Sequence, residues 1–233
     1  MGLAIDEVLL DSVRGGGRGA IRFWVNRHAV VIGRSQSVAE EVDLEAADRA
    51  GIPVLRRISG GGAVYHYPGN LNLSVTLSKG AGIASVADVF RTFGEAAATG
   101  LAPWADVTCG ENALRVGDLK IGGAAQARRG DAVLYHSTLL LAPDETPMSR
   151  LLLAHRPGYA PTRLASRPSR TITMAEICDD PVEVPDVIMS LRRAVEERLG
   201  VSARPDDLTG EELQRAHELV RDRYGRDAWN RSH

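Results

Sequence analysis

Several features that mark other protein classes are scarce or missing in this chain of 233 residues. Its two cysteines, Cys109 and Cys178, are too few for a disulfide framework and form no CxxC metal-binding pair. The longest apolar runs, such as Ala29–Gly33 and Thr138–Ala142, are far shorter than the roughly 20 residues of a membrane helix. No basic segment followed by an apolar stretch opens the chain, so no secretory signal is expected. These absences predict a cytoplasmic protein without a membrane partner.

The charge balance indicates no nucleic-acid partner, because 28 Lys and Arg residues face 30 Asp and Glu residues. Lysine is scarce, since most of the positive charge is arginine, and each lysine in a conspicuous place therefore carries weight. Hydrophobic residues at 44% and charged residues at 25% are typical of a globular protein. This composition excludes a disordered chain, a coiled coil and a collagen-like fibre.

Hydrophobic periodicity predicts a mixed α/β domain. Apolar residues recur at helical spacing in six segments, near 3–13, 42–50, 84–99, 146–153, 184–199 and 209–224. Strand patterns occupy 21–25 and 29–33 (joined by a turn at 26–28), both ends of 54–77, and 105–108, 112–116, 119–122 and 132–141. Strands fill the first two thirds of the chain with helices around them. We therefore expect one domain over 1–233 with a helical C-terminal extension at about 184–230.

The segment Arg56–Val64 (RRISGGGAV) is the sharpest local feature of the sequence. Its three glycines, Gly60–Gly62, leave backbone N–H groups open to a phosphate or a carboxylate. Arg56 and Arg57 add planar, permanently charged groups. No GK[ST] and no helix follow, so the segment is neither a Walker A loop nor a dinucleotide fingerprint. The segment predicts an anion site, and the alternative is a plain flexible turn after a strand.

The next segment, His66–Leu73 (HYPGNLNL), adds a histidine and two asparagines. Asn70 and Asn72 alternate with apolar residues on a predicted strand, so their amides could point into a polar pocket. The alternative is that Gly69 and Asn70 make a turn and that Asn72 bonds to the backbone.

Lys120 is the second strong feature, because it leads into the small residues of the segment 117–126 (GDLKIGGAAQ). Small residues permit close backbone approach. A lysine at such a bend could neutralise a carboxylate and a phosphate at once. The alternative is a solvated lysine in a hairpin turn.

Cys109 lies eleven residues before Lys120. A nearby lysine can favour the thiolate and make it a nucleophile, whereas an isolated cysteine is most often a small buried apolar residue. His136 fits a core or supporting histidine. The other histidines have no ligand-like spacing, so no metal site is expected.

Taken together, these motifs resemble the lipoate–protein ligase family, which is related to biotin–protein ligases and octanoyltransferases. The resemblance runs in order over about 140 residues, through the segments LAIDE (3–7), VVIGRSQ (30–36), RRISGGGAVYHYPGNLNLS (56–74), KIGGAAQ (120–126) and HSTLL (136–140). It implies the mixed α/β fold of class II aminoacyl-tRNA synthetases and biotin ligases, with a central mixed sheet flanked by helices.

The resemblance also implies a two-step reaction. ATP, with Mg²⁺, activates lipoate or octanoate as acyl-AMP, and the acyl group passes to a lysine of a lipoyl domain. The expected acceptor is a 2-oxoacid dehydrogenase subunit or a glycine cleavage H protein. Lys120 is the expected catalytic residue, touching the acyl carbonyl and the nucleotide phosphate. The expected ATP contacts are Arg57, Gly61, Gly62, Ala63, Val64, Tyr65, Lys120 and Ala124. The expected acyl-substrate contacts are Arg56, Ser59, Gly60, His66, Asn70, Asn72, Lys120, Gly123 and His136. Apolar strand residues near 71–77 and 133–135 are expected to wall the acyl tunnel.

This sequence departs from the family pattern in three places. Asn112-Ala113 stands where ligases usually have Asn-Asp, and His136-Ser137-Thr138 replaces His-Gly-Thr. After Trp229 there is no room for the accessory C-terminal domain of longer ligases, which implies a separate small partner protein. Two alternatives stay open, namely a cysteine-dependent octanoyl or lipoyl transferase that uses Cys109, and a non-catalytic lipoyl-binding scaffold.

Overall fold

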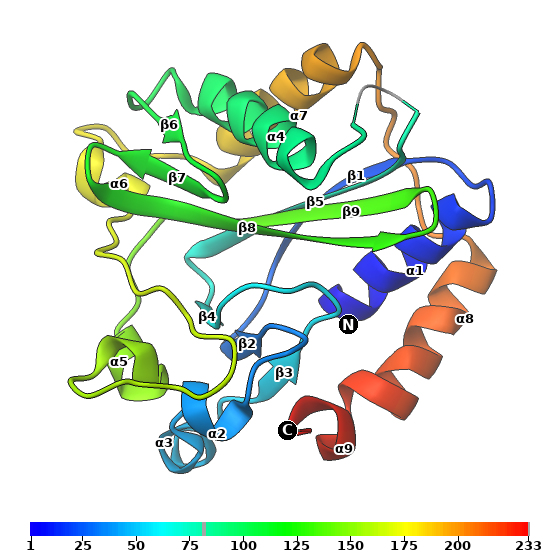
Figure 1. The fold of residues 1–233 in the computed structure, drawn as a ribbon. Helices are drawn as coiled ribbons and strands as arrows, with labels where there is room; N and C mark the ends of the chain where they lie inside the picture. The colour runs from blue at the N-terminus through cyan, green and yellow to red at the C-terminus, as the bar shows by residue number, and fades with distance from the viewer. Residues whose placement is uncertain (81–82, 233) are drawn as a thin grey trace.

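The computed structural model describes residues 1–80 and 83–232 (Figure 1). Its main element is a six-stranded antiparallel sheet in the order β1-β5-β9-β8-β7-β6. The bounds of these strands are β1 Ala20–Val25, β5 Asn70–Ser78, β6 Thr108–Cys109, β7 Ala113–Val116, β8 Leu119–Arg129 and β9 Ala132–Leu140. A small sheet has the order β3-β2-β4, with β2 Ala29–Ile32, β3 Val54–Arg56 and β4 Val64–His66. Strands β2 and β3 are parallel, whereas β2 and β4 are antiparallel.

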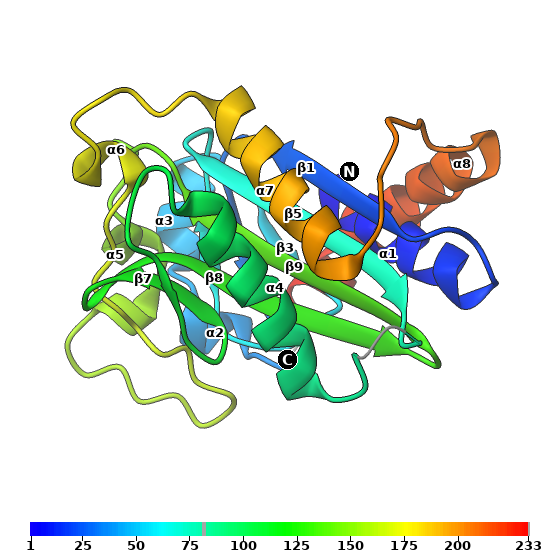
Figure 2. The ribbon, with the colours of Figure 1, turned by 90° about the horizontal axis from the view of Figure 1, so that it is seen from above.

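Helices cover both faces of the large sheet. On one face α4 (Val86–Leu101) and α7 (Val184–Leu199) lie side by side, as Figure 2 shows from above. On the other face α1 (Gly2–Arg14) packs against β5 and β9, and α8 (Gly210–Leu219) packs on the outer side of α1. The remaining helices are short, namely α2 Val38–Glu41, α3 Leu44–Arg49, α5 Met148–Leu151, a 3₁₀ turn Leu153–His155, α6 Met174–Ile177, a π-helical turn Val220–Tyr224 and α9 Asp227–Asn230. Within the part of the chain described here, no helix combines the length and the apolar character needed to cross a membrane.

Strand alternation decides which side chains can reach the space between the two sheets. In β5, Leu71, Leu73 and Val75 point into the core under α4 and α7. Successive side chains on a strand face opposite ways, so the even-numbered residues from Asn70 to Thr76 face α1 and the small sheet. The expectation that apolar residues of 71–77 and 133–135 wall the acyl tunnel is therefore wrong. Most of those apolar side chains form the core on the far face of the sheet, whereas Leu134 packs beneath α1, outside the pocket lining described below.

The mixed α/β class with helices around a large sheet is confirmed, and α7 begins and ends where helical spacing predicts. The large sheet is wholly antiparallel, so the expected mixture of directions occurs only in the small sheet. The strands predicted at 21–25 and 29–33 do not pair with each other, because β1 joins β5 and β2 starts the small sheet. The helix predicted at 42–50 is α3, which begins at Leu44 because the Asp43 side chain caps it by accepting from the Ala46 N–H.

Candidate active site

A pocket of about 500 Å³ lies between the large sheet and the small sheet. Four residues paired across the large sheet form one wall, in the order Trp24, Asn72, Thr138 and Gly123. Leu3 of α1 and two side chains of the small sheet, Val31 and Val64, add apolar surface. The pocket thus has a lining that suits a hydrocarbon chain, next to the charged groups described below.

Arg57 is buried at the edge of this pocket, where carbonyl groups surround it. Its Nη2 donates to the carbonyls of Gly60 (2.6 Å) and Gly62 (2.8 Å), and its Nη1 donates to that of Val31 (3.1 Å). Its Nε donates to the Ser59 hydroxyl (3.0 Å). Burial lowers its pKa to about 10, which still leaves the guanidinium charged at neutral pH. The positive charge is solvated by peptide dipoles and is not neutralised by a carboxylate within the described residues.

The carbonyl groups that turn toward Arg57 set the direction of the N–H groups in the glycine loop, which we define as Ser59–Ala63. In a planar trans peptide the N–H points opposite to the C=O. The N–H groups of Gly61 and Ala63 therefore point away from the guanidinium. Gly61 has φ +87°, a backbone conformation that favours glycine. The Ala63 N–H donates to the Ser166 Oγ (2.7 Å), so the Gly61 N–H is the donor that the loop presents to an anion, backed by a buried positive charge.

Lys120 lines the pocket because of a β-bulge at the start of β8. The pairing of β7 with β8 skips one residue after Lys120, so Ile121 is extra. Ile121 is buried in the core, whereas Lys120 and Gly123 both line the pocket although they are three residues apart. A Cβ atom on Gly123 would lie 3.0 Å from the Lys120 Nζ. Glycine at this position therefore leaves room for the ammonium group.

The pocket is strongly cationic. Burial lowers the pKa of Lys120, and the charges of Arg115 and Arg57 lower it further. Arg167 also lines the pocket, and Glu111 is the one carboxylate among the described residues of the lining. Like charges this close repel one another unless an anion is bound. The site is therefore built for a ligand with several negative charges.

His66 supplies a neutral polar group in this cationic surrounding. It is buried, and the Asn26 Nδ2 donates to its Nδ1 (3.0 Å). Burial lowers its pKa to about 3, and the nearby charges of Arg57 and His136 act in the same direction. Since Nδ1 accepts a hydrogen bond, the single proton of the ring sits on Nε2. His66 can therefore donate one hydrogen bond to a ligand oxygen without adding charge.

His136 connects the large sheet to the glycine loop. Its Nε2 lies 2.6 Å from the Ser59 Oγ, and its Nδ1 lies 3.4 Å from the Asp6 Oδ2. Asp6 is a buried residue of α1. Because Ser59 also accepts from Arg57, a continuous chain of contacts runs from Asp6 to the buried guanidinium.

Residues 159–169, which we call the capping loop, pass over the pocket and are fastened to α2. The buried Glu41 accepts from the Tyr159 hydroxyl (2.5 Å) and from the Ser166 hydroxyl (2.5 Å). The Ser166 Oγ in turn accepts from the Gln36 amide (3.1 Å) and from the Ala63 N–H (2.7 Å). The capping loop is thereby tied directly to the glycine loop.

Most of the sequence-predicted site positions line this pocket, namely Arg57, Gly61, Gly62, Ala63, Val64, His66, Asn72, Lys120, Gly123, Ala124 and His136. Ser59 and Gly60 lie just behind it as partners of Arg57. The Tyr65 side chain points to the other side of β4, where its hydroxyl donates to Asp144 (3.0 Å). Asn70 is buried outside the lining and donates to the Leu139 carbonyl (3.3 Å).

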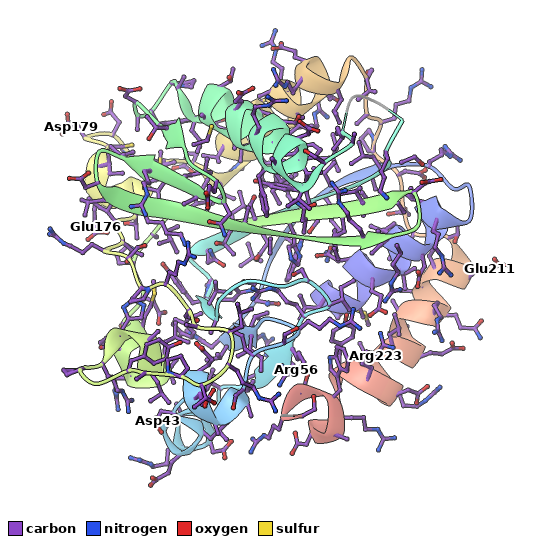
Figure 3. The ribbon with its side chains drawn as sticks, viewed as in Figure 1. Asp43, Arg56, Glu176, Asp179, Glu211 and Arg223 are labelled. Carbon is purple, nitrogen blue, oxygen red and sulfur yellow. The ribbon has the colours of Figure 1, made fainter. Side chains whose placement is uncertain are left out.

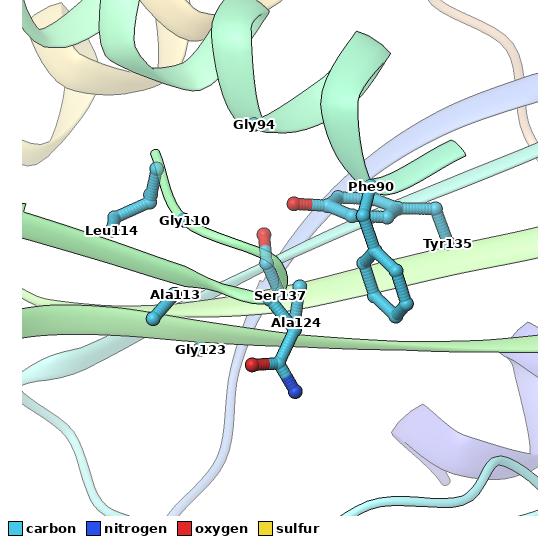
Figure 4. A pocket seen from close by; sticks show the side chains of 10 residues that line it. Phe90, Gly94, Gly110, Ala113, Leu114, Gly123, Ala124, Tyr135 and Ser137 are labelled. Carbon is cyan, nitrogen blue, oxygen red and sulfur yellow. The ribbon is translucent and has the colours of Figure 1, made fainter. Parts of the chain in front are cut away.

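The structure places two further predicted residues outside the lining. Arg56, the last residue of β3, lies beside the C-terminal segment (Figure 3) and donates to the carbonyls of Gln36 (2.8 Å) and Trp229 (3.1 Å). Cys109 lies on the α4 side of the large sheet, against Gly94. Figure 4 shows this side, where Gly94 and Tyr135 border a cavity of about 10 Å³, enough for at most one water molecule.

Sequence reasoning missed several residues in the pocket or beside it. Asp6 could have been noticed as an acid on the apolar face of the first helix. Arg115 has no local signal, because only the pairing of β7 with β8 brings it beside Lys120. Ser166 and Arg167 lie in a proline- and arginine-bearing loop, 161–168, whose sequence has no motif that indicates a site.

Magnesium would have to be held mainly by the nucleotide. Within residues 1–80 and 83–232, no group of three or more His, Cys, Asp or Glu side chains is placed to hold a metal ion. Mg²⁺ with a polyphosphate commonly takes one or two carboxylates, phosphate oxygens and water. The carboxylate of Glu111 and the amide oxygen of Asn112 are the side-chain oxygens at the cationic part of the lining that fit this role.

Comparison with known proteins gives a consistent result. The family model of the lipoyl protein ligase A/B catalytic domain matches residues 1–196. Lipoate-protein ligase A subunit 1 of Thermoplasma acidophilum is 32% identical, with 99% of this chain and 91% of that protein covered. The octanoyltransferase LipM of Symbiobacterium thermophilum is 30% identical, with 98% of this chain and 92% of that protein covered.

Solved structures agree over nearly the whole chain. A lipoate-protein ligase A bound with ATP has a TM-score of 0.86 at 32% identity, covering 98% of this chain and 92% of that one. The Thermoplasma acidophilum protein Ta0514 with bound lipoic acid has a TM-score of 0.85 at 30% identity, covering 99% of this chain and 93% of that one. A bi-partite lipoate protein ligase of the same organism, described with its E2 lipoyl domain, has a TM-score of 0.85 at 31% identity, covering 99% of this chain and 90% of that one.

Proposed function

This chain belongs to the family of lipoyl protein ligase A/B catalytic domains, and we propose that it is a lipoate–protein ligase that uses ATP. In the first step the carboxylate of lipoate or octanoate attacks the α-phosphorus of ATP, and pyrophosphate leaves. In the second step the ε-amino group of an acceptor lysine attacks the acyl carbon, and AMP leaves with the electrons of the broken bond. The observation that carries the proposal is one pocket with an apolar wall, four cationic side chains and a single carboxylate.

The pocket residues suit the first step because two anions must approach each other. Trp24, Val31 and Val64 offer apolar surface for the hydrocarbon chain. In this proposal Lys120 neutralises both the acyl carboxylate and the α-phosphate, and the glycine loop supplies the Gly61 N–H where charge develops. Preorganised charge of this kind lowers the barrier, since the protein does not have to reorganise during the reaction. When bound with ATP, Mg²⁺ would supply further neutralisation of the phosphates.

A cysteine-dependent acyl transfer is the second candidate, because a relative named octanoyltransferase LipM is 30% identical. That reaction needs a thiolate that can reach the acyl carbonyl held by Lys120. Cys109 lies against α4, on the opposite face of the sheet from the pocket. The position of Cys109 therefore supports the ATP-dependent route over the transferase route.

Two protein partners belong to the proposal. The acceptor is a lipoyl-domain protein such as a 2-oxoacid dehydrogenase subunit or a glycine cleavage H protein. The second partner that we propose is a separate small protein that acts as another subunit of the ligase. Both are supported by the similarity to a relative named lipoate-protein ligase A subunit 1 and to a bi-partite lipoate protein ligase that was described with its E2 lipoyl domain. We also propose a cytoplasmic location, in keeping with two free cysteines.

The proposal is tested with purified protein and an apo lipoyl domain. The acceptor is followed by mass spectrometry with lipoate plus ATP and, separately, with octanoyl-carrier protein. A mass gain that requires ATP supports the ligase, and a gain only with the carrier protein supports the transferase. Pyrophosphate release with and without a candidate small partner protein measures the need for that partner. No gain under any of these conditions would leave the binding scaffold as the better explanation.

A further inference from the structure

Asp6 is a buried carboxylate beside the pocket that the mechanism above does not use. It lies on α1 and is almost fully buried, with 1% of its surface exposed. Its Oδ1 accepts from the Arg22 guanidinium (2.8 Å) and its Oδ2 accepts from the Ser74 hydroxyl (2.9 Å). The same Oδ2 lies 3.4 Å from the His136 Nδ1. Taking a carboxylate out of water has a large free-energy cost, which these partners offset, and its position beside the pocket suggests a role beyond stability.

The chain of contacts from Asp6 ends at the glycine loop. The His136 Nε2 lies 2.6 Å from the Ser59 Oγ, which accepts from the Arg57 Nε (3.0 Å). Ser59 is buried and outside the pocket lining, so it is not placed as a nucleophile. The tautomer of His136 decides where the hydroxyl proton of Ser59 points. The proton points to the His136 Nε2 when that nitrogen is free to accept, and away from it when that nitrogen carries a proton.

We propose that Asp6 is a positioning residue that sets the tautomer of His136 and, through Ser59, the orientation of Arg57 and the glycine loop. This inference rests on the proposed function for its effect on rate. With the imidazole proton on Nδ1, facing Asp6, the Nε2 accepts from the Ser59 hydroxyl. The Ser59 oxygen then keeps its lone pairs for the Arg57 Nε–H. With the proton on Nε2, two donors would compete for that one oxygen and the hydroxyl proton would lose its acceptor.

The Asp6→Asn variant should reverse the tautomer, because Arg22 fixes how the new amide lies. Arginine can only donate, so the amide oxygen must take the Oδ1 place beside Arg22. The amide nitrogen then takes the Oδ2 place, and its two protons go to the Ser74 Oγ, whose own proton must turn away, and to the His136 Nδ1. The histidine must carry its proton on Nε2. A wrong tautomer of this kind lowers turnover while the overall geometry is retained.

Asp11→Asn is a matched control. It makes the same change on the same helix and removes a carboxylate that pairs with Arg129 (2.6 Å). Asp11 has no contact with the chain from Asp6 to Arg57.

The first measurement is the tautomer of His136 by long-range ¹H–¹⁵N correlation in the ¹⁵N-labelled full chain, assigned with His136→Gln. We expect a proton on Nδ1 in the unmodified protein and in Asp11→Asn, and on Nε2 in Asp6→Asn. The unmodified protein alone can overturn the proposal, because a proton on Nε2 or a doubly protonated ring contradicts it. This readout does not depend on activity, so an inactive protein with the expected tautomer would refute the ligase function and not the contact chain.

The second measurement is the rate of pyrophosphate release. We expect Asp6→Asn to lower kcat by about 10- to 100-fold and to leave the KM for ATP within about 3-fold. In a Ser59→Ala background the same change should have an effect of less than about 2-fold, because the chain is already broken. Equal effects of Asp6→Asn in both backgrounds would show that Asp6 acts by another route.

Discussion

Replacing Lys120 with methionine tests whether the positive charge is needed for catalysis without disturbing the fold. Methionine keeps most of the apolar stem and removes the ammonium group, so no large cavity forms. The ammonium is partly buried beside Arg115 and Arg57, and both burial and repulsion lower its pKa. Without ligand, the charge of Lys120 is therefore a cost to the folded state. Its removal should leave stability unchanged or raise it.

The same change should be severe for the reaction. Loss of one preorganised charged contact to a developing transition state costs about 10²–10³ in rate, or about 2.7–4 kcal/mol. We expect Lys120→Met to lose acyl-adenylate formation by that factor, measured as pyrophosphate release. The unfolding midpoint should stay within about 3 °C or rise, because about 1 kcal/mol corresponds to 2–4 °C for a chain of this length.

Lys79 provides the control, because Lys79 and Lys120 are the two lysines of the sequence. Lys79 is on the surface and donates to the Gly130 carbonyl (2.5 Å), away from the pocket. Lys79→Met should keep full activity. Near-normal turnover by Lys120→Met would refute the catalytic assignment. A large fall in its unfolding midpoint would show that the charge of Lys120 stabilises the folded chain. That result would contradict the inference, drawn from its lowered pKa, that the charge is unfavourable in the folded state.

Three further changes test other parts of the site. Cys109→Ser should keep ligase activity, since the thiol faces α4, and an inactive variant or an acyl adduct on Cys109 would instead favour the transferase. Gly123→Ala places a Cβ 3.0 Å from the Lys120 Nζ, so we expect kcat to fall about 10-fold with an intact fold by circular dichroism; unchanged kcat would mean that the ammonium can move freely. His66 has a folded pKa of about 3 against 6.5 when unfolded, so below pH 6.5 the unfolded chain takes up a proton that the folded chain excludes. The native protein should thus lose about 2 kcal/mol of stability between about pH 8 and about pH 5 that His66→Asn does not lose, and parallel denaturation curves for the two proteins would contradict the burial of His66.

The sequence was informative where a local pattern has one physical meaning. Helical spacing places α7 correctly, because a 3.6-residue period over sixteen residues is hard to mistake. The glycine run and Lys120 indicated an anion site, and they do line one cationic pocket. Both patterns depend on the local chain alone, which is why they could be read without knowing the fold.

Other features depend on pairing between distant segments. The pattern of β5 predicts a strand but not which face is core, so the side chains expected in the acyl tunnel were the wrong set. Tyr65 follows Val64 on β4 and therefore must face away from the pocket. The bulge that brings Lys120 and Gly123 to one side is fixed by the register of β7 with β8. No spacing within the sequence reveals that register.

Arg57 and the glycine loop behave like a small ion-binding loop whose ion is covalently attached. Carbonyl oxygens of Val31, Gly60 and Gly62 surround the guanidinium as they would a bound metal cation. A metal can leave such a loop, whereas this cation stays, because its pKa of about 10 keeps it charged at neutral pH. The loop therefore needs no cation from solution to hold its shape before the substrate arrives. The ligand, in turn, meets the outward Gly61 N–H that the buried charge polarises, and has no need to contact the charge itself.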